Sequence, residues 1–441
     1  MTRYCFVCLK RCHNLLPCKN CANVGFCSKM CAKKAGKNKL EGDRYPNRHK
    51  YDCNGMLPVI FNCLNESKPS QFCSSLSHTV FNCIANTKLR RLIEYMNTGG
   101  KHKDGKWHAA FKGITDIRTI HPNIWDSSNY ASVAWLQPCT DGWKKTKGKY
   151  GSMLFDFTIA SIFLAYCLYI SGYPMDWRAS IDSDMNRHFF EKPPATWIAA
   201  CFLYHFQATA INSFRCTDFI FWQDLKKREY LSCGIYPSLS LINHSCNPSA
   251  DYRFTTDGAA VLIATRNLKA GSEITIAYDV TYAESNTQNR KQVLKESFFF
   301  ECMCEACVDD WNDNNPQELI KCAVCHFESG VTTPKCPMCR LDLPAEEGLR
   351  VVIDSQALIE EVKYREWTDE LQKRFASLIN KANSLLASPS NTVTLLKEAL
   401  LEKVDEKVAM WIEEPWQFNF FTCMEPGKSL FSKEDRWHLL D

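Results

Sequence analysis

The sequence predicts an α+β protein in which helices and short strands are combined with cysteine-rich metal modules. Two stretches, Phe157–Ile170 and Ala195–Phe214, carry strong apolar helical faces. Short β-rich runs at Ala259–Ala264 and Ile274–Tyr278 are interrupted by Asn-Pro and Ala-Gly turns. Cysteine accounts for 25 of the 441 residues, often in closely spaced pairs. These observations indicate a mixed fold that is organised partly around metal ions.

The composition excludes several classes of protein. Charged residues make up 23% and apolar residues 45% of the chain, as in ordinary globular proteins, which excludes collagen-like, acidic disordered and low-complexity chains. The length predicts about two to four domains. Lys and Arg together number 53 against 49 Asp and Glu, and a net charge of +4 does not by itself indicate nucleic-acid binding.

The first residues predict a reducing compartment. Met1–Tyr4 lead directly into Cys5 without the apolar segment of a secretory signal, so we expect a protein of the nucleus and cytoplasm. Cysteines are reduced there, and pairs of them indicate metal before disulfide. The longest uncharged stretch, Phe157–Met175, loses its apolar character at Ser171, short of the about 20 residues of a membrane span. We therefore expect a buried helix and no membrane contact.

The first cysteine cluster contains four ligand pairs. Short spacings let two ligands of one pair reach the same ion at about 2.3 Å. Alternation of the pairs predicts a cross-brace with two closed zinc sites, of which His49 is the least secure ligand because Cys12 and His13 could compete with it. One site then consists of Cys5, Cys8, Cys27 and Cys31, and the other of Cys18, Cys21, His49 and Cys53.

Two further clusters follow near residue 300. Cys302-x-Cys304-x2-Cys307 is one ligand short of a tetrahedral site, so the fourth ligand must come from elsewhere. Two Cys-x2-Cys pairs with ten residues between them predict a zinc ribbon formed by Cys322, Cys325, Cys336 and Cys339. A redox dithiol is the less favoured alternative, because two pairs are present and no βαβ pattern surrounds them.

Residues 234–304 contain three polar or aromatic elements. They are Asn243-His244-Ser245-Cys246-Asn247-Pro248, the spacing Glu273-x4-Tyr278, and Phe300 two residues before Cys302. Alone, the first would be a hydrogen-bonded turn, and Tyr278 a core or surface side chain. Together and in this order they resemble the SET domain of protein-lysine methyltransferases. The N-terminal cluster resembles the MYND zinc finger, so the chain resembles the SET and MYND domain (SMYD) family over roughly residues 5–310.

This resemblance implies a domain organisation. The implied fold is a set of small SET-type β-sheets with an inserted helical region and peripheral zinc modules. Its parts are a MYND-type finger at 1–53, a helical connecting and SET-insert region at 54–230, a SET catalytic core at 231–300, a post-SET zinc knuckle with a zinc ribbon at 301–343, and a helical C-terminal region at 346–441. Within that last region we expect helices at Val351–Val362, Thr368–Leu386 and Thr392–Met410, broken at Ser388-Pro389-Ser390.

The resemblance also implies an activity: transfer of a methyl group from S-adenosylmethionine to a lysine of a protein substrate. Tyr278 would be the catalytic tyrosine, and Cys246 would complete the post-SET zinc site, for about four zinc ions in all. The residues implied to contact the cofactor are Asn212, Asn243, His244, Tyr278 and Phe300. The MYND finger implies protein partners, often with proline-containing peptides, and no direct nucleic-acid binding is expected. A non-catalytic zinc scaffold that docks partners is the alternative.

Three features depart from the family pattern. No Gly-x-Gly loop stands near the start of the sequence, Ser249 follows Pro248 where the family usually has Asn, and Phe298 replaces a frequent second active-site Tyr. The loop normally forms one side of the cofactor pocket, whose buried charges need partners. We therefore expect this chain to bind S-adenosylmethionine poorly and to methylate slowly or not at all. Without that tyrosine's hydroxyl, product specificity or activity would be altered.

Overall fold

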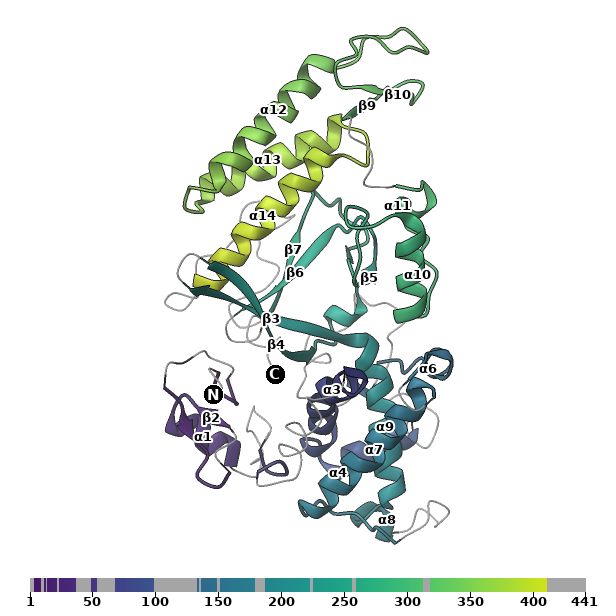
Figure 1. The fold of residues 1–441 in the computed structure, drawn as a ribbon, viewed down its shortest axis with the longest axis vertical. Coiled ribbons are helices and arrows are strands. Elements are labelled where there is room, and N and C mark those ends of the chain that lie inside the picture. The colour runs from purple at the N-terminus through teal and green to yellow at the C-terminus, as the bar shows by residue number, and fades with distance from the viewer. Residues whose placement is uncertain are drawn as a thin grey trace.

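The computed structural model describes most of the chain, which divides into a helical layer, a β core, a C-terminal helical layer and two peripheral cysteine modules (Figure 1). The described residues are 4–8, 12, 14–21, 24–36, 49–53, 68–98, 133–134, 136–148, 151–178, 187–222, 225–255, 259–311 and 318–410. Parts of the predicted regions at 54–230 and 346–441, including residues 411–441, therefore lie outside the described residues.

The helical layer occupies the lower part of Figure 1. Helices α7 and α9 pack side by side at its centre, where the rings of Phe157 and Phe206 stack with 5.5 Å between centroids. Ser152 caps α7 by accepting a hydrogen bond from the Phe155 backbone N–H. The members are α3 (Lys68–Ala85), α4 (Leu89–Thr98), α6 (Thr140–Lys145), α7 (Met153–Ile170), α8 (Arg187–Glu191) and α9 (Ala195–Asn212).

Helix α7 is the stretch that we expected to be a buried helix. It is long and apolar enough to cross a membrane by length and composition, but 39% of its residues are buried within the helical layer. Phe157, Leu164 and Leu168 on one face belong to the core of this layer. The prediction of a helix is confirmed, and one of its faces is buried in this core while side chains such as Phe155 and Ile162 are exposed.

The helical region ends earlier than the predicted residue 230. Helix α9 stops at Asn212, and the antiparallel hairpin of β3 (Ser213–Trp222) and β4 (Leu225–Ile235) follows directly. The sequence of β3 contains Phe, Thr, Ile and Trp, which favour strands. The first strand therefore begins before residue 231, the predicted start of the SET core.

Two small pairs of strands complete the β core. Strand β5 (Asn243–His244) runs parallel to β8 (Thr275–Ile276), with His244 opposite Ile276. Strand β6 (Ala250–Phe254) is antiparallel to β7 (Ala260–Ala264), which confirms the predicted run at 259–264. A short 3-10 turn, η4 (Leu239–Leu241), leads into β5.

The C-terminal helices form the upper part of Figure 1. The predicted break at Ser388-Pro389-Ser390 separates α13 from α14, and Ile263 of β7 belongs to the core of these helices. The elements after the β core are α10 (Thr287–Ser297), α11 (Glu305–Val308), β9 (Leu319–Lys321), β10 (Glu328–Gly330), α12 (Ala345–Val362), α13 (Asp369–Leu385) and α14 (Asn391–Met410). The N-terminal module consists of β1 (Leu16–Pro17), β2 (Gly25–Phe26) and α1 (Lys29–Gly36).

Candidate functional site

Four groups of side chains could each hold a metal ion, and they are the four groups that the spacing and the resemblance predicted. The ligand atoms of each group lie within 4.8 Å of one another. Four thiolates around a tetrahedral zinc at about 2.3 Å stand about 3.8 Å apart. Several sulfur pairs come close to this separation, such as 3.5 Å for Cys8 and Cys27 and 3.7 Å for Cys18 and Cys53. The donor sets and their spacing therefore fit zinc.

His49 occupies the ligand position that the sequence left least secure. Its Nε2 lies 3.2 Å from Cys21 Sγ, and its Nδ1 lies 2.5 Å from a carboxylate oxygen of Asp52. The other oxygen of Asp52 lies 3.4 Å from His78 Nε2 on helix α3. A carboxylate behind a histidine ligand fixes the ring and its tautomer. Of the two competitors, Cys12 is not part of the cluster and His13 lies outside the described residues.

Cys246 lies with the three cysteines that follow residue 300. Its Sγ is 3.5 Å from Cys307 Sγ, and its backbone N–H donates to Cys304 Sγ at 3.4 Å. Because more than fifty positions separate Cys246 from this knuckle in the sequence, spacing alone could not identify it as the fourth ligand. The cluster attaches the segment after β5 to the knuckle that begins at Cys302.

The remaining cluster is made of two equivalent turns. Cys322 Sγ lies 3.5 Å from Cys339 Sγ, and Cys325 Sγ lies 3.4 Å from Cys336 Sγ. Each turn closes with the same backbone hydrogen bonds, and His326 and Arg340 have positive φ angles of 60° and 65° at matching positions. This repeated geometry is that of two metal knuckles facing one ion.

His244, Tyr278 and Phe300 form an aromatic cluster where β5 and β8 end. The ring centroids of His244 and Tyr278 are 5.3 Å apart, and Phe300 lies 5.9 Å and 6.1 Å from them. The Tyr278 backbone N–H donates to His244 Nδ1 at 3.0 Å, and the Tyr278 hydroxyl donates to the Ile242 carbonyl at 2.9 Å. The predicted catalytic tyrosine therefore lies beside the Asn-His strand.

Burial keeps the polar members of this cluster uncharged. It lowers the pKa of His244 to about 4, so the imidazole is neutral near pH 7 and its Nδ1 can accept a hydrogen bond. It also raises the pKa of Tyr278, which remains a phenol. A neutral histidine and a neutral tyrosine cannot act as strong acid or base, but they can orient other groups.

The two asparagines make hydrogen bonds that join segments on either side of η4 and β5. Asn243 Nδ2 donates to Glu273 Oε1 at 2.7 Å, which joins β5 to the residues just before β8. Asn212 Nδ2 donates to the Ala208 carbonyl at 2.8 Å, and the Asn212 carbonyl accepts from Ser240 Oγ at 3.0 Å. The C-terminus of α9 is thereby held against the turn that precedes β5.

Three consecutive phenylalanines connect this cluster to the helical layer. Phe298 lies 5.2 Å from the Tyr278 ring and, like Phe300, packs against the core that contains Cys246. Phe299 has a positive φ of 63° and contacts Trp143 of α6 edge-on, with 4.8 Å between centroids. Of these three, only Phe298 and Phe300 were predicted from the sequence to be near the site. The run of three Phe was a visible signal, yet only the tertiary structure shows that the middle ring points the other way.

Arg290 of α10 was also missed as an individual residue. It is completely buried, and its guanidinium donates to the carbonyls of Ala306 and Trp311 at 2.8 Å each, to Thr287 Oγ1 at 2.9 Å and to the Ser285 carbonyl. These bonds hold α11 and the knuckle beside α10. Arg290 therefore supports the cluster that contains Cys246.

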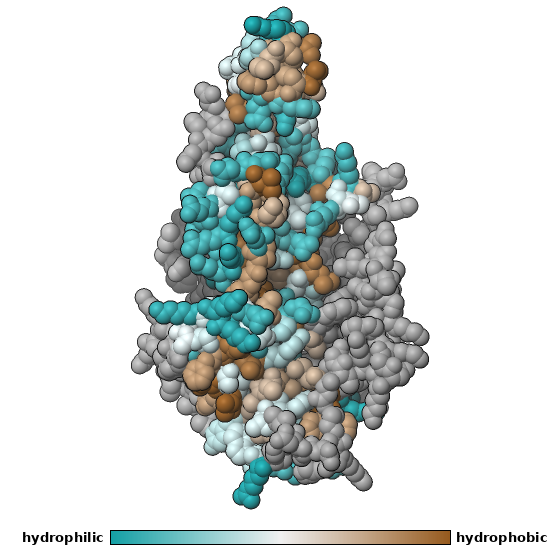
Figure 2. Space-filling view, turned by 90° about the vertical axis from the view of Figure 1, so that its right-hand side faces the viewer, coloured by the Kyte–Doolittle hydropathy of each residue, from teal (hydrophilic) through white to brown (hydrophobic). Residues whose placement is uncertain are grey.

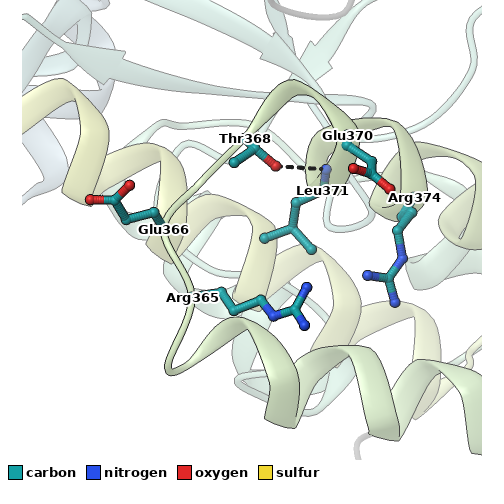
Figure 3. A pocket seen from close by; sticks show the side chains of 6 residues that line it. All are labelled: Arg365, Glu366, Thr368, Glu370, Leu371 and Arg374. Carbon is teal, nitrogen blue, oxygen red and sulfur yellow. Dashed lines mark hydrogen bonds between the residues drawn. The ribbon is translucent and has the colours of Figure 1, made fainter.

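A cavity of about 280 Å³ between α12 and α13 lies apart from this cluster (Figure 3). The guanidinium groups of Arg365 and Arg374 point toward the same space below Leu371. Both share the single carboxylate of Glu361, at 2.8 Å each, which offsets one of their two positive charges. Glu366 and Glu370 line the same cavity. This arrangement does not provide an anion site.

Comparison with known proteins identifies the type of domain. The family model of the SET domain matches residues 66–279, which include Asn212, Asn243, His244 and Tyr278. Over these residues the chain matches the SET domain, and it is similar to SET and MYND domain-containing proteins. Residues 280–307, with Phe300 and the cysteine knuckle, follow the matched segment.

Several curated proteins are similar to the chain. Protein-lysine N-methyltransferase SMYD4 of Danio rerio is 23% identical over 366 residues, covering 76% of this chain and 45% of that protein. Protein-lysine N-methyltransferase SMYD4 of Pongo abelii is 36% identical over 77 residues, or 18% and 10% of the two chains. Histone-lysine N-methyltransferase SMYD3 of Mus musculus is 41% identical over 75 residues, 17% of each. The chain thus spans less than half the length of these relatives.

Proposed function

We propose that the chain is an S-adenosylmethionine-dependent protein-lysine N-methyltransferase. The observation that carries this proposal is the contact of His244 and Tyr278, both within the segment that matches the SET domain, with Phe300, which follows that segment. The similarity to the methyltransferases SMYD4 and SMYD3 supports the same reaction class. A purely non-catalytic scaffold is not favoured by this similarity.

The residues present fit the cofactor in their chemistry. Asn243 beside His244 and Asn212 at the end of α9 offer amide groups, the neutral His244 offers polar contacts, and the ring of Phe300 can pack against an adenine. S-adenosylmethionine, when bound, supplies an activated methyl group. Because its ammonium and carboxylate need partners when buried, the amides and nearby backbone would hold it. These four residues and Tyr278 are the proposed cofactor contacts.

The chain's own contribution to methyl transfer would be positioning. Direct displacement by a lysine amine needs a neutral amine, an aligned approach and a water-poor channel. Tyr278 is the proposed catalytic residue, because its phenol can orient the amine while Phe298 and Phe300 provide aromatic walls that favour a cationic side chain. Zinc in the Cys246 cluster would hold the knuckle over this channel.

The partners and the location remain proposals that rest on the sequence. The substrate would be a protein with an accessible lysine, and the N-terminal zinc module, if of MYND type, would dock protein partners. Neither direct nucleic-acid binding nor membrane contact is proposed, and the location would be nucleus and cytoplasm.

Calorimetric titration of the purified chain with S-adenosylmethionine is the decisive test, combined with transfer of a labelled methyl group to lysine-containing peptides. Binding that is weakened by His244→Ala, together with label on lysine, would support the proposal. The expectation that this chain binds the cofactor poorly is tested by the same titration. A well-folded chain with no binding at millimolar cofactor and no transfer would leave the scaffold alternative.

A further inference from the structure

Helix α7 presents an apolar stripe on the face opposite to its buried one. Its members are spaced by four, three, four and three residues, which is the heptad spacing of a helix seam that packs on a second helix. The side chains of the stripe are between 41% and 53% exposed. We call Phe155, Ile159, Ile162, Tyr166 and Tyr169 the α7 stripe.

Two neighbouring side chains widen this surface. Trp177 lies 5.5 Å from the ring of Tyr166 and 5.3 Å from that of Tyr169, and Ile170 is 43% exposed next to them. Helix α7 contains one charged residue, Asp156, and this side chain is buried. Figure 2 shows brown apolar side chains gathered over the lower, helical part of the molecule. The stripe is therefore an uncharged, half-exposed surface that no helix among the described residues buries.

The area of the α7 stripe, together with Ile170 and Trp177, can be compared with that of known interfaces. Seven side chains that are about half exposed present on the order of 600 Å², taking roughly 200 Å² for each large side chain. This reaches the upper end of the largest patch on a typical monomer, which is about 300–600 Å². Two such surfaces together would bury about 1,200 Å², the lower limit for a specific and stable interface.

We propose that the α7 stripe is the interface of a symmetric homodimer, in which α7 packs antiparallel to α7 of a second copy. The stripe has Ile162 at its centre, so a two-fold axis there places Ile162 against itself, Ile159 against Tyr166, and Phe155 against Tyr169. Such an interface is self-complementary. Because the helices carry no exposed charge, self-association meets no like-charge repulsion.

The first experiment measures the mass of the intact chain in solution by sedimentation and light scattering over a range of micromolar concentrations. We expect a dimer, and we expect Ile162→Glu to raise its dissociation constant by at least about 100-fold, because two carboxylates would meet at the axis. Ile353→Glu on α12 is the matched control, since Ile353 is 55% and Ile162 is 53% exposed. Circular dichroism and zinc content would verify that both variants fold.

A second experiment tests the antiparallel pairing. Phe155→Lys and Tyr169→Glu should each be monomeric alone, because each buries unpaired charges in an otherwise apolar interface. Mixed together, they should form a heterodimer in which Lys from one chain meets Glu from the other. Rescue on mixing identifies the stripe and its orientation.

Three outcomes would overturn the proposal. They are a wild-type chain that stays monomeric, a dimer that survives Ile162→Glu as well as Ile353→Glu, and a monomer that binds phosphatidylcholine vesicles through the stripe. The last would make α7 a membrane-contacting surface. None of these results depends on methyltransferase activity, so failure of the proposed function would not affect the test.

Discussion

The Tyr278 hydroxyl donates a hydrogen bond to the backbone carbonyl of Ile242, with 2.9 Å between the oxygens. The Tyr278 backbone N–H donates at the same time to His244 Nδ1. The tyrosine therefore bridges both ends of β5, on either side of Asn243. This double contact fixes its ring near Phe298 and Phe300, where a lysine channel is proposed.

Tyr278→Phe should have two separately measurable effects, one on the stability of the fold and one on turnover. Loss of one hydrogen bond to Ile242 should lower the free energy of unfolding by about 1 kcal/mol. If the phenol orients the lysine amine, kcat should fall by at least about tenfold, which corresponds to about 1.4 kcal/mol in the barrier. Denaturant unfolding and steady-state methyl transfer measure the two effects.

Tyr282→Phe provides the matched control for that substitution. The Tyr282 hydroxyl shares a hydrogen bond of 2.6 Å with Thr394 of α14, away from His244. This variant should lose a similar amount of stability and keep its kcat. Equal losses of kcat in both variants would argue against a catalytic role for Tyr278.

Metal analysis should find about four zinc ions per chain. Cys246→Ser and Cys325→Ser should each lose one ion, whereas Cys139→Ser, outside the clusters, should retain all four. Because Cys246 connects the segment after β5 to the knuckle, its variant should also lose affinity for S-adenosylmethionine, and Cys325→Ser should lose less. Atomic emission and calorimetry measure these changes. A wild-type content near two would mean that some clusters do not bind zinc.

Arg290→Met should strongly destabilise the knuckle. The substitution leaves the buried carbonyls of Ala306 and Trp311 without their donor, at a cost of at least about 3 kcal/mol in unfolding free energy. Arg374→Met is the control, because Arg374 is largely exposed and its pair with Glu361 should be worth less than about 1 kcal/mol. Chelator-induced release of zinc should become faster only in the Arg290 variant.

Gly142→Ala should disturb the run of three phenylalanines. Alanine in a helix normally stabilises relative to glycine, but a Cβ at position 142 would overlap the ring of Phe299. We expect a loss of roughly 1–3 kcal/mol and a raised KM for the lysine substrate, since Phe298 and Phe300 flank Phe299. Thermal unfolding and steady-state kinetics measure both.

A double-mutant cycle tests whether overlap with the Phe299 ring causes the destabilisation by Gly142→Ala. In a Phe299→Ala background, Gly142→Ala should become neutral or stabilising, because the ring that it would overlap is gone. Gly330→Ala is a further control, since its Cβ would meet only Thr333 Oγ1 at an ordinary 3.6 Å. An unchanged penalty in the Phe299→Ala background would contradict this account.

The sequence by itself determined the cysteine pairs of the N-terminal module and the ribbon, and left only His49 as a less secure ligand. Pairs such as Cys322-x2-Cys325 have a spacing that one ion dictates, so the chemistry is readable without the fold. The apolar pattern likewise predicted α7 and the helices on either side of Ser388–Ser390.

Only the tertiary structure decided the relationships between distant residues. It brought Cys246 to Cys307, turned Phe299 toward Trp143 and left the α7 stripe exposed. Local spacing carries no information on which segments meet, because loops of many different lengths can close with similar entropy. The apolar residues of α7 all look like core in the sequence, and the number of neighbouring helices determines which face is actually covered.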